Sequence, residues 1–203
     1  MYRVLSNIYY FGRMIKDKAI FMYLEYLGNE ETHIIDHVDR IDVIETNDGF
    51  LNAFKNLFIE PTKIVDNIYL GNAYNASNFN QLDELNINTI INVTNEIPNY
   101  FDNIQEYDYL KININDTNSD SIKNFFDESN QYIKDIQQQK PDKNILIHCY
   151  MGSSRSATIL TAYLLKNFNL NPKQAFSLLQ EKRPVVNINT QFWDELQDYY
   201  TNL

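Results

Sequence analysis

The segment 144-NILIHCYMGSSRSATILTAYLL-165 decides the fold, and it contains the only cysteine of this 203-residue chain, Cys149. Its first residues, 144–147, form a short apolar run that is consistent with a buried strand. Residues 157–165 form a second apolar run with the character of a helix. Between the two runs lies a short stretch with one glycine and several serines. The segment therefore predicts a strand, a tight loop and a helix, with Arg155 six positions after Cys149.

A loop of this kind can turn its backbone N–H groups toward one point, where the N-terminus of the following helix adds its partial positive charge. Arg155 adds a full charge, and its planar fork can donate two parallel hydrogen bonds to two phosphate oxygens. A cysteine is nucleophilic as the thiolate, and these positive groups favour that anion. Gly152 permits a backbone conformation that a side chain would obstruct. The loop therefore predicts an oxyanion cradle with a reactive Cys149 at its base.

Two neighbours of the cysteine have supporting roles in this interpretation. Ser156 is predicted to donate its hydroxyl to the Cys149 sulfur when that sulfur becomes a leaving group. His148 is expected to fix the loop by hydrogen bonding to backbone, and not to act as a base. A lone cysteine after an apolar strand is usually a small buried core residue, but the joint pattern H-C-x-x-G-x-x-R-S is much more specific. The predicted phosphate-binding residues are Tyr150, Met151, Gly152, Ser153, Ser154 and Arg155.

Cleavage of a phosphate ester also requires an acid, because the oxygen of a serine, threonine or tyrosine leaves poorly as an anion. Residues 107–114 alternate like a strand, and residues 115–121 are rich in turn formers. Asp116 therefore lies at the carboxyl end of a strand, where ligand sites gather in open α/β sheets. We expect Asp120 to cap the following helix instead, and Asp108 to lie on a solvated strand face. The predicted catalytic residues are thus Cys149, Arg155, Asp116 and Ser156.

The segment 148–156 resembles the signature loop of the cysteine-dependent protein phosphatases, and its continuation to residue 165 resembles the dual-specificity subfamily. Residues 68–71 (IYLG) are similar to the opening strand of that subfamily, and residues 90–94 (IINVT) to its second core strand. A later motif of that subfamily is similar to Arg183-Pro184-Val185-Val186 followed by Asn189 and Phe192, with Ile188 where a proline is usual. The resemblance covers about residues 61–203. It implies a protein phosphatase domain with its general acid at Asp116 and no metal or cofactor.

The segment Glu60-Pro61-Thr62 marks the predicted domain boundary, with an accessory extension at 1–60 and the catalytic domain at 61–203. Within the catalytic domain the patterns predict strand, strand, helix, strand, strand, helix, strand and then three helices. The last three are expected at 153–168, 172–182 and about 189–200, because Pro172 suits a helix start and Pro184 ends a helix. We therefore expect an α/β fold with a central, mainly parallel sheet flanked by helices.

The extension has enough apolar content to argue against a disordered tail. His33 and His37 are spaced i, i+4, which suits a metal on a helix, but the glutamate of H-E-x-x-H is missing and a surface pair is favoured. No apolar run reaches the ~18 residues of a membrane span, and no convincing secretory signal is present. Arg3, Arg13 and Lys16 precede the first acidic residue, which leaves a mitochondrial presequence as a less favoured alternative.

Composition narrows the classes of function. The formal net charge is -10, so we expect no nucleic-acid partner, and an anionic membrane surface would repel the protein. A single cysteine excludes an internal disulfide and fits a reducing compartment. We therefore expect a cytoplasmic location, with the nucleus as an alternative, and we leave the oligomeric state open.

Three functions fit these patterns. The first is hydrolysis of phosphotyrosine and phosphoserine or phosphothreonine in proteins through a cysteinyl-phosphate intermediate, with a phosphoprotein as the partner. The second is hydrolysis of another phosphate ester, such as an inositol lipid or an RNA 5′ end. Lipid-directed relatives often carry lysine in the loop, and this loop carries none. The third is a phospho-binding scaffold with weak activity, although Cys149, Arg155 and Asp116 are all present.

Overall fold

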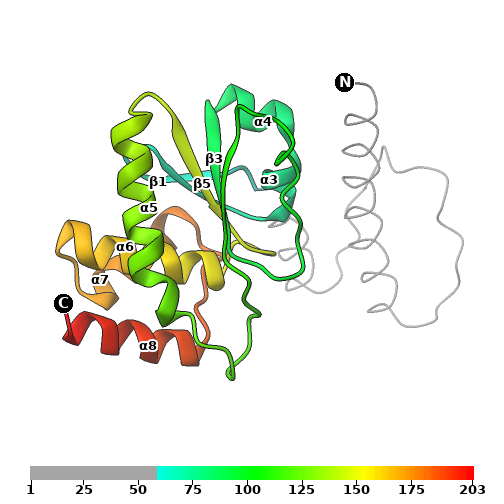
Figure 1. Cartoon of the computed structure of the whole chain (residues 1–203). Helices are drawn as coiled ribbons and strands as arrows, with labels where there is room; N and C mark the ends of the chain where they lie inside the picture. The colour runs from blue at the N-terminus through cyan, green and yellow to red at the C-terminus, as the bar shows by residue number, and fades with distance from the viewer. Residues whose placement is uncertain (1–58) are drawn as a thin grey trace, which may run out of the picture. The chain divides into compact units, whose positions relative to one another are not determined.

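The computed structural model describes residues 59–203. These residues form one compact unit, in which helices cover both faces of a sheet (Figure 1). This confirms the α/β class that the sequence predicts. The expected extension, with His33 and His37, lies outside the described residues apart from its last two positions, so the boundary at residue 60 stays a prediction. Within residues 59–203 no helix has the length and apolar character needed to cross a membrane.

The sheet of the described residues has five strands, and its order places the fifth in the centre. The strands are β1 (Thr62–Val65), β2 (Ile68–Gly71), β3 (Ile87–Asn92), β4 (Asp108–Lys111) and β5 (Asn144–His148), arranged β1-β2-β5-β3-β4. β1 pairs antiparallel with β2, and all the other pairs are parallel. The residue that follows β5 is therefore at the carboxyl edge of the parallel strands, where α/β sheets bind ligands.

The apolar run of β5 is explained by its central position. Ile145, Leu146 and Ile147 are fully buried, because β5 has a strand on each side and helices over both faces. A strand covered in this way needs apolar residues at every position, whereas a half-exposed strand alternates. The run 144–147 therefore specifies the innermost strand, and Cys149 lies directly after the end of that strand.

The helices form two groups. α3 (Ala73–Ser77) and α4 (Phe79–Glu84) lie on one face of the sheet, and α5 (Phe126–Gln139), α6 (Arg155–Phe168), α7 (Pro172–Lys182) and α8 (Thr190–Thr201) lie on the other (Figure 1). A short 3-10 helix, η1 (Lys123–Phe125), precedes α5. Residues 155–165 of α6 are all buried, because this helix packs between the sheet and the three other helices of its layer. The N-terminus of α6 is thereby fixed beside the end of β5.

The predicted order of elements is confirmed with one difference. Between β2 and β3 the chain forms two short helices where one was expected, because the Asn78 side chain accepts a hydrogen bond from the Gln81 N–H and starts α4 anew. α7 begins and ends at the predicted residues, with Pro172 in its first turn. The strand expected at 107–114 is shorter, since β4 covers only Asp108–Lys111.

The prediction that Asp120 caps the following helix is wrong. Its carboxylate accepts a hydrogen bond from the Thr117 hydroxyl, and neither η1 nor α5 has a side-chain cap at its own N-terminus. Glu195 of α8 serves this purpose instead, since its Oε2 accepts hydrogen bonds from the N–H groups of Ile122 and Lys123, each at 2.8 Å. The first N–H groups of a helix need an acceptor, and here a distant helix supplies it.

Candidate active site

Cys149 directly follows β5 and is only 1% exposed. Its Sγ accepts hydrogen bonds from the Gly152 N–H at 3.3 Å and from the Ser156 hydroxyl at 3.2 Å. Ser156 belongs to the first turn of α6, so the sulfur lies beside the positive end of that helix. Two hydrogen-bond donors and the helix N-terminus therefore surround the sulfur with positive partial charge.

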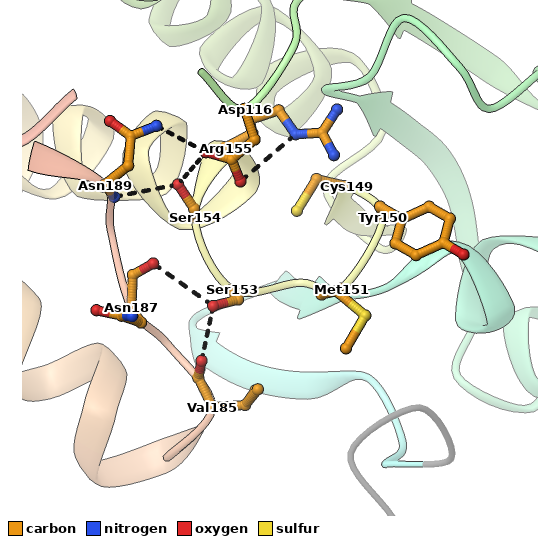
Figure 2. A pocket seen from close by; sticks show the side chains of 10 residues that line it. All are labelled: Asp116, Cys149, Tyr150, Met151, Ser153, Ser154, Arg155, Val185, Asn187 and Asn189. Carbon is orange, nitrogen blue, oxygen red and sulfur yellow. Dashed lines mark hydrogen bonds and ion pairs between the residues drawn. The ribbon is translucent and has the colours of Figure 1, made fainter. Parts of the chain in front are cut away.

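The carbonyl groups of the loop after β5 are bound by donors from several parts of the chain. In a trans peptide the C=O and the N–H point in opposite directions, so binding a carbonyl on the outer side turns the next N–H inward. Figure 2 shows the ribbon of this loop curving around Cys149. The bound carbonyls and their donors are Cys149 with His148 Nδ1 (3.3 Å), Tyr150 with Ala73 N (3.1 Å), Gly152 with Arg183 Nε (3.1 Å), Ser153 with Asn187 N (3.0 Å) and Ser154 with Thr158 N (2.8 Å).

His148 contacts backbone, as the sequence predicts. A carbonyl oxygen can only accept, so the Nδ1 that contacts the Cys149 carbonyl carries the proton. Burial lowers the pKa of His148 to about 3. The ring is therefore neutral near pH 7, and it orients the loop without adding a charge to it.

Arg155 opens α6 and is 5% exposed. Glu96, in the loop after β3, binds its fork in a bidentate manner: Nη1 donates to Oε2 at 2.9 Å and Nη2 to Oε1 at 2.8 Å. The Nε makes no hydrogen bond within the described part of the chain, and it lies 3.9 Å from Asp116 Oδ2. Glu96 thus holds one edge of the guanidinium, and the Nε edge is left for an anion.

The ion pair keeps both of its members charged. Burial by itself would lower the pKa of Arg155, but the hydrogen bonds to Glu96 and the nearby charges of Cys149, Glu96 and Asp116 together outweigh burial, and the pKa is raised. Burial likewise acts to raise the pKa of Glu96, but Arg155 and the backbone hydrogen bonds of Asn95 and Glu96 together outweigh it, so that the pKa is lowered. The positive charge beside Cys149 is therefore maintained at neutral pH.

Asp116 lies in the loop after β4, with 35% of its side chain exposed. Its Oδ1 accepts hydrogen bonds from the Ser154 hydroxyl at 2.8 Å and from the Asn189 amide at 2.7 Å. Asn189 also caps α8, where its own Oδ1 accepts from the Phe192 N–H. Asp116 is thereby tied both to the loop around Cys149 and to the start of α8 (Figure 2).

These side chains surround one cavity of about 300 Å³, a volume at the lower end of the range for small-molecule sites. Among the described residues of its lining, Arg155 is the only cation and Asp116 the only carboxylate. The remaining walls are polar or apolar and neutral. The lining consists of Asp116, Cys149, Tyr150, Met151, Ser153, Ser154, Arg155, Val185, Asn187 and Asn189 (Figure 2).

The structure thus brings the predicted site residues together, while their chemical roles stay predictions. Cys149, Arg155 and Asp116 line the same cavity, and Ser156 contacts the sulfur from α6. Of the six predicted cradle residues, five contribute to the lining, and Gly152 contributes its N–H to the sulfur. The five that line the cavity are Tyr150, Met151, Ser153, Ser154 and Arg155.

Gly152 is the cradle position at which a glycine is required. Its φ is +69°, in the left-handed region that L side chains rarely adopt. A Cβ there would lie 2.4 Å from the Gly71 carbonyl oxygen and 2.8 Å from Arg183 Nη2. Both the backbone conformation and the lack of space therefore exclude a side chain, as the sequence predicts.

Three residues with contacts to the site were not recognised from the sequence as part of it. Glu96 follows a strand next to β5, so the rule that ligand sites lie beyond the carboxyl ends of strands could have indicated it. Asn189 lies three residues before Phe192 and could have been recognised as a helix cap, but nothing local connects it with Asp116. Arg183, like Asn189, enters the sequence analysis only through the family resemblance, and no sequence pattern indicates its contact with Gly152.

A buried cysteine at the carboxyl edge of a central strand, with an arginine at the start of the next helix, is the arrangement that the resemblance to phosphatases predicts. The family model described as "Dual specificity phosphatase, catalytic domain" matches residues 68–202. The chain therefore belongs to the dual specificity phosphatase family.

Similar proteins agree with this assignment. The chain is 32% identical over 140 residues to human protein phosphatase Slingshot homolog 2, covering 68% of this chain and 10% of that protein. It is 34% identical over 143 residues to human dual specificity protein phosphatase 9, covering 70% of this chain and 37% of that protein. The crystal structure of DUSP15 is 30% identical, with a TM-score of 0.64, covering 70% of this chain and 87% of that one. The matched region of the chain thus spans only 10% of Slingshot homolog 2 and 37% of dual specificity protein phosphatase 9.

Proposed function

We propose that this chain hydrolyses phosphotyrosine and phosphoserine or phosphothreonine in proteins through a cysteinyl-phosphate intermediate. The observation that carries the proposal is the convergence of Cys149, Arg155 and Asp116 on one cavity. A nucleophile, an anion-binding cation and a carboxylic acid are the groups that phosphate ester hydrolysis needs. Membership of the dual specificity phosphatase family supports the same reaction.

In the first step the Cys149 thiolate attacks phosphorus, and the bond between phosphorus and the ester oxygen breaks. The carboxylic acid of Asp116 gives its proton to that oxygen, so that the substrate leaves as a neutral alcohol or phenol. The Nε edge of Arg155 and the inward N–H groups of the loop bind the other phosphate oxygens. The products of this step are the dephosphorylated side chain, a phosphocysteine and an ionised Asp116.

In the second step a water molecule attacks the phosphocysteine, and the Asp116 carboxylate takes a proton from it. The bond between sulfur and phosphorus breaks, and inorganic phosphate leaves. The electron pair returns to Cys149, whose sulfur is 3.2 Å from the Ser156 hydroxyl. This hydroxyl stabilises the departing thiolate, which is the role we propose for Ser156.

The charge of the cavity favours a substrate with a single phosphate. Within the described lining the one cation is Arg155, so an inositol lipid with further phosphates would find no second positive side chain there. The neutral lining residues Tyr150, Met151 and Val185 suit the side chain and neighbouring backbone of a phosphoprotein. We propose a protein substrate for this reason, and the expected cytoplasmic location stays a prediction.

The proposal is tested with p-nitrophenyl phosphate and a phosphothreonine peptide. Cys149→Ser removes the thiolate, so we expect turnover of both substrates to be lost. Asp116→Ala should lower kcat much more for the peptide, because p-nitrophenolate leaves readily without a proton. Asp120→Ala is the matched control, since it removes a carboxylate from the same loop but outside the cavity lining, and its kcat should match that of the unaltered chain.

Each outcome decides a different part of the mechanism. Normal turnover by Cys149→Ser would show that Cys149 is not the nucleophile. Equal losses on both substrates for Asp116→Ala would exclude the acid role. Binding of the phosphopeptide without any burst of released p-nitrophenol would indicate a scaffold, and faster hydrolysis of an inositol phosphate or an RNA 5′ phosphate would assign a different substrate class.

A further inference from the structure

Arg183 is a buried cation whose charge the proposed reaction steps do not use. It lies at the C-terminus of α7 and is 1% exposed. Its hydrogen-bond partners among the described residues are neutral: the carbonyls of Gly152 and Glu60 and the Thr62 hydroxyl. No carboxylate pairs with it within residues 59–203. Since an isolated buried charge is costly, the position calls for a nearby anion.

The guanidinium lies directly against the back of the cradle. Its Nε donates to the Gly152 carbonyl at 3.1 Å. Its Nη2 is buried without a hydrogen-bond partner in the described part of the chain, and it would be 2.8 Å from a Cβ placed on Gly152. The N–H of the same Gly152 donates to Cys149 Sγ. One residue of backbone therefore connects the buried cation to the nucleophile.

Arg183 controls the direction of a second peptide as well. The Gly152 carbonyl and the Ser153 N–H belong to one peptide group and point in opposite directions. By holding the carbonyl on the outer side, Arg183 turns the Ser153 N–H toward the cavity that Ser153 lines. Of the five donors to loop carbonyls described above, Arg183 is the only charged one, and charge-assisted hydrogen bonds are the stronger kind.

The electrostatic properties of Arg183 agree with this geometry. Burial lowers the pKa of Arg183 to about 10, and the Cys149 thiolate acts in the opposite direction. Arg183 therefore keeps its charge at neutral pH, and its interaction with the sulfur is favourable. By reciprocity, a cation that is stabilised by the thiolate also stabilises the thiolate.

We propose that Arg183 is a positioning residue of the phosphate cradle, which fixes the Gly152–Ser153 peptide and supplies the positive charge that holds Cys149 as a thiolate from behind. This role rests on the proposed function, because a thiolate under inward N–H groups serves a reaction with phosphate. It assigns the cradle two cations, with Arg155 facing the substrate and Arg183 facing away from it.

Three variants separate the charge of Arg183 from its fork. Arg183→Met removes both, and Arg183→Lys keeps the charge but cannot reproduce the planar fork. Lys182→Met is the matched control, because Lys182 is the neighbouring cation and donates to the Ile64 carbonyl, away from the cradle. Thermal unfolding followed by circular dichroism shows whether each variant folds.

The first readout is the rate at which iodoacetamide alkylates the protein between pH 4 and 9. Cys149 is the only cysteine of the chain, so the reaction reports on it alone. We expect the pH midpoint of alkylation to rise by about one unit in Arg183→Met, the size of effect that a single nearby charge produces in a protein. The midpoint should stay within about 0.3 units in Arg183→Lys and in the control. An unchanged midpoint in Arg183→Met would overturn the electrostatic role.

The second readout is kcat/KM for p-nitrophenyl phosphate at pH 7. Both Arg183 variants should lose about tenfold or more, because neither holds the Gly152–Ser153 peptide with a fork, and the control should lose nothing. Normal turnover by Arg183→Lys would overturn the positioning role. If Arg183→Met does not fold, Arg183→Lys decides alone: a retained midpoint with reduced turnover supports the proposal, and any other combination contradicts it.

The two readouts also separate this inference from the proposed function. If the unaltered chain hydrolyses none of the phosphate esters tested, the proposed function fails, and the alkylation midpoints still judge the charge of Arg183. If the unaltered chain is active and the Arg183 variants equal it in both readouts, the inference fails and the function stands.

Discussion

The hydrogen bond between Asn189 and Asp116 gives a prediction that can be worked out from the structure. Asn189 uses its two amide atoms for two purposes: Oδ1 caps α8, and Nδ2 donates to Asp116 at 2.7 Å. Asn189→Ala removes both contacts. We expect stability to fall because α8 loses its cap. We expect the rate of catalysis to fall separately, because the carboxylate of Asp116 loses the amide that positions it.

The two losses have different sizes and are measured differently. Loss of an asparagine N-cap costs about 1 kcal/mol in the free energy of unfolding, measured by urea titration. A hydrogen bond to a partly exposed carboxylate contributes about 1 kcal/mol, which corresponds to roughly a fivefold change in rate. We therefore expect kcat for a phosphothreonine peptide to fall about fivefold, and kcat for p-nitrophenyl phosphate to change less than about twofold, because its leaving group needs little protonation.

Asn171 provides the matched control. It caps α7 in the same way, its Oδ1 accepting from the Gln174 N–H at 3.0 Å, and it does not line the cavity. Asn171→Ala should lower the free energy of unfolding by a similar amount and leave kcat unchanged for both substrates. The reasoning is refuted if Asn189→Ala keeps normal kcat for the peptide, if both substrates slow equally, or if Asn171→Ala slows the peptide as much.

Three further predictions concern stability. Glu96→Gln should lower the free energy of unfolding by about 1 kcal/mol in urea, because Arg155 loses a charged partner that is itself 42% exposed; equal stability would contradict a role for the ion pair. The pKa of His148 is about 3 in the folded chain against the ordinary 6.5. Below pH 6.5 the imidazole of His148 is therefore protonated in the unfolded chain but stays neutral in the folded chain. Its contribution to stability is therefore lost as pH falls through that range, about 2 kcal/mol between pH 7 and 5, and His148→Gln should not show this part of the loss in urea titrations at the two pH values. Gly152→Ala should lower the melting temperature and stop turnover, because its φ is +69° and a Cβ would meet the Gly71 carbonyl at 2.4 Å; normal melting and turnover would show that the loop can rearrange.

The sequence predicts those parts of the fold that depend on local patterns. The apolar run 144–147 specifies the central strand because a strand with both faces covered needs apolar residues throughout. α7 could be bounded to the residue because Pro172 starts it and Pro184 follows its end. The cradle could be located because its residues are consecutive in the chain.

The remaining features depend on contacts between distant segments. Asp120 looks like a helix cap by position, but Glu195 of another helix takes that place. Arg183 likewise makes contacts that its position in the chain does not indicate, because it donates hydrogen bonds both to the Gly152 carbonyl and to the Glu60 carbonyl just before β1. Neither contact has a periodic or compositional signal, because each depends on how α7 and α8 pack on the sheet. Sequence patterns therefore locate the reacting groups, and the structure is needed to find the groups that hold them.

The carbonyl contacts of the cradle also predict how residues 59–203 should unfold. They join the loop after β5 to the start of α3, to the segment after α7 and to α6, so the cradle cannot persist once any of these elements separates. For residues 59–203 we therefore expect loss of turnover and loss of helical circular dichroism to follow one two-state transition in rising urea. The proposed activity would then report the native population of this part of the chain.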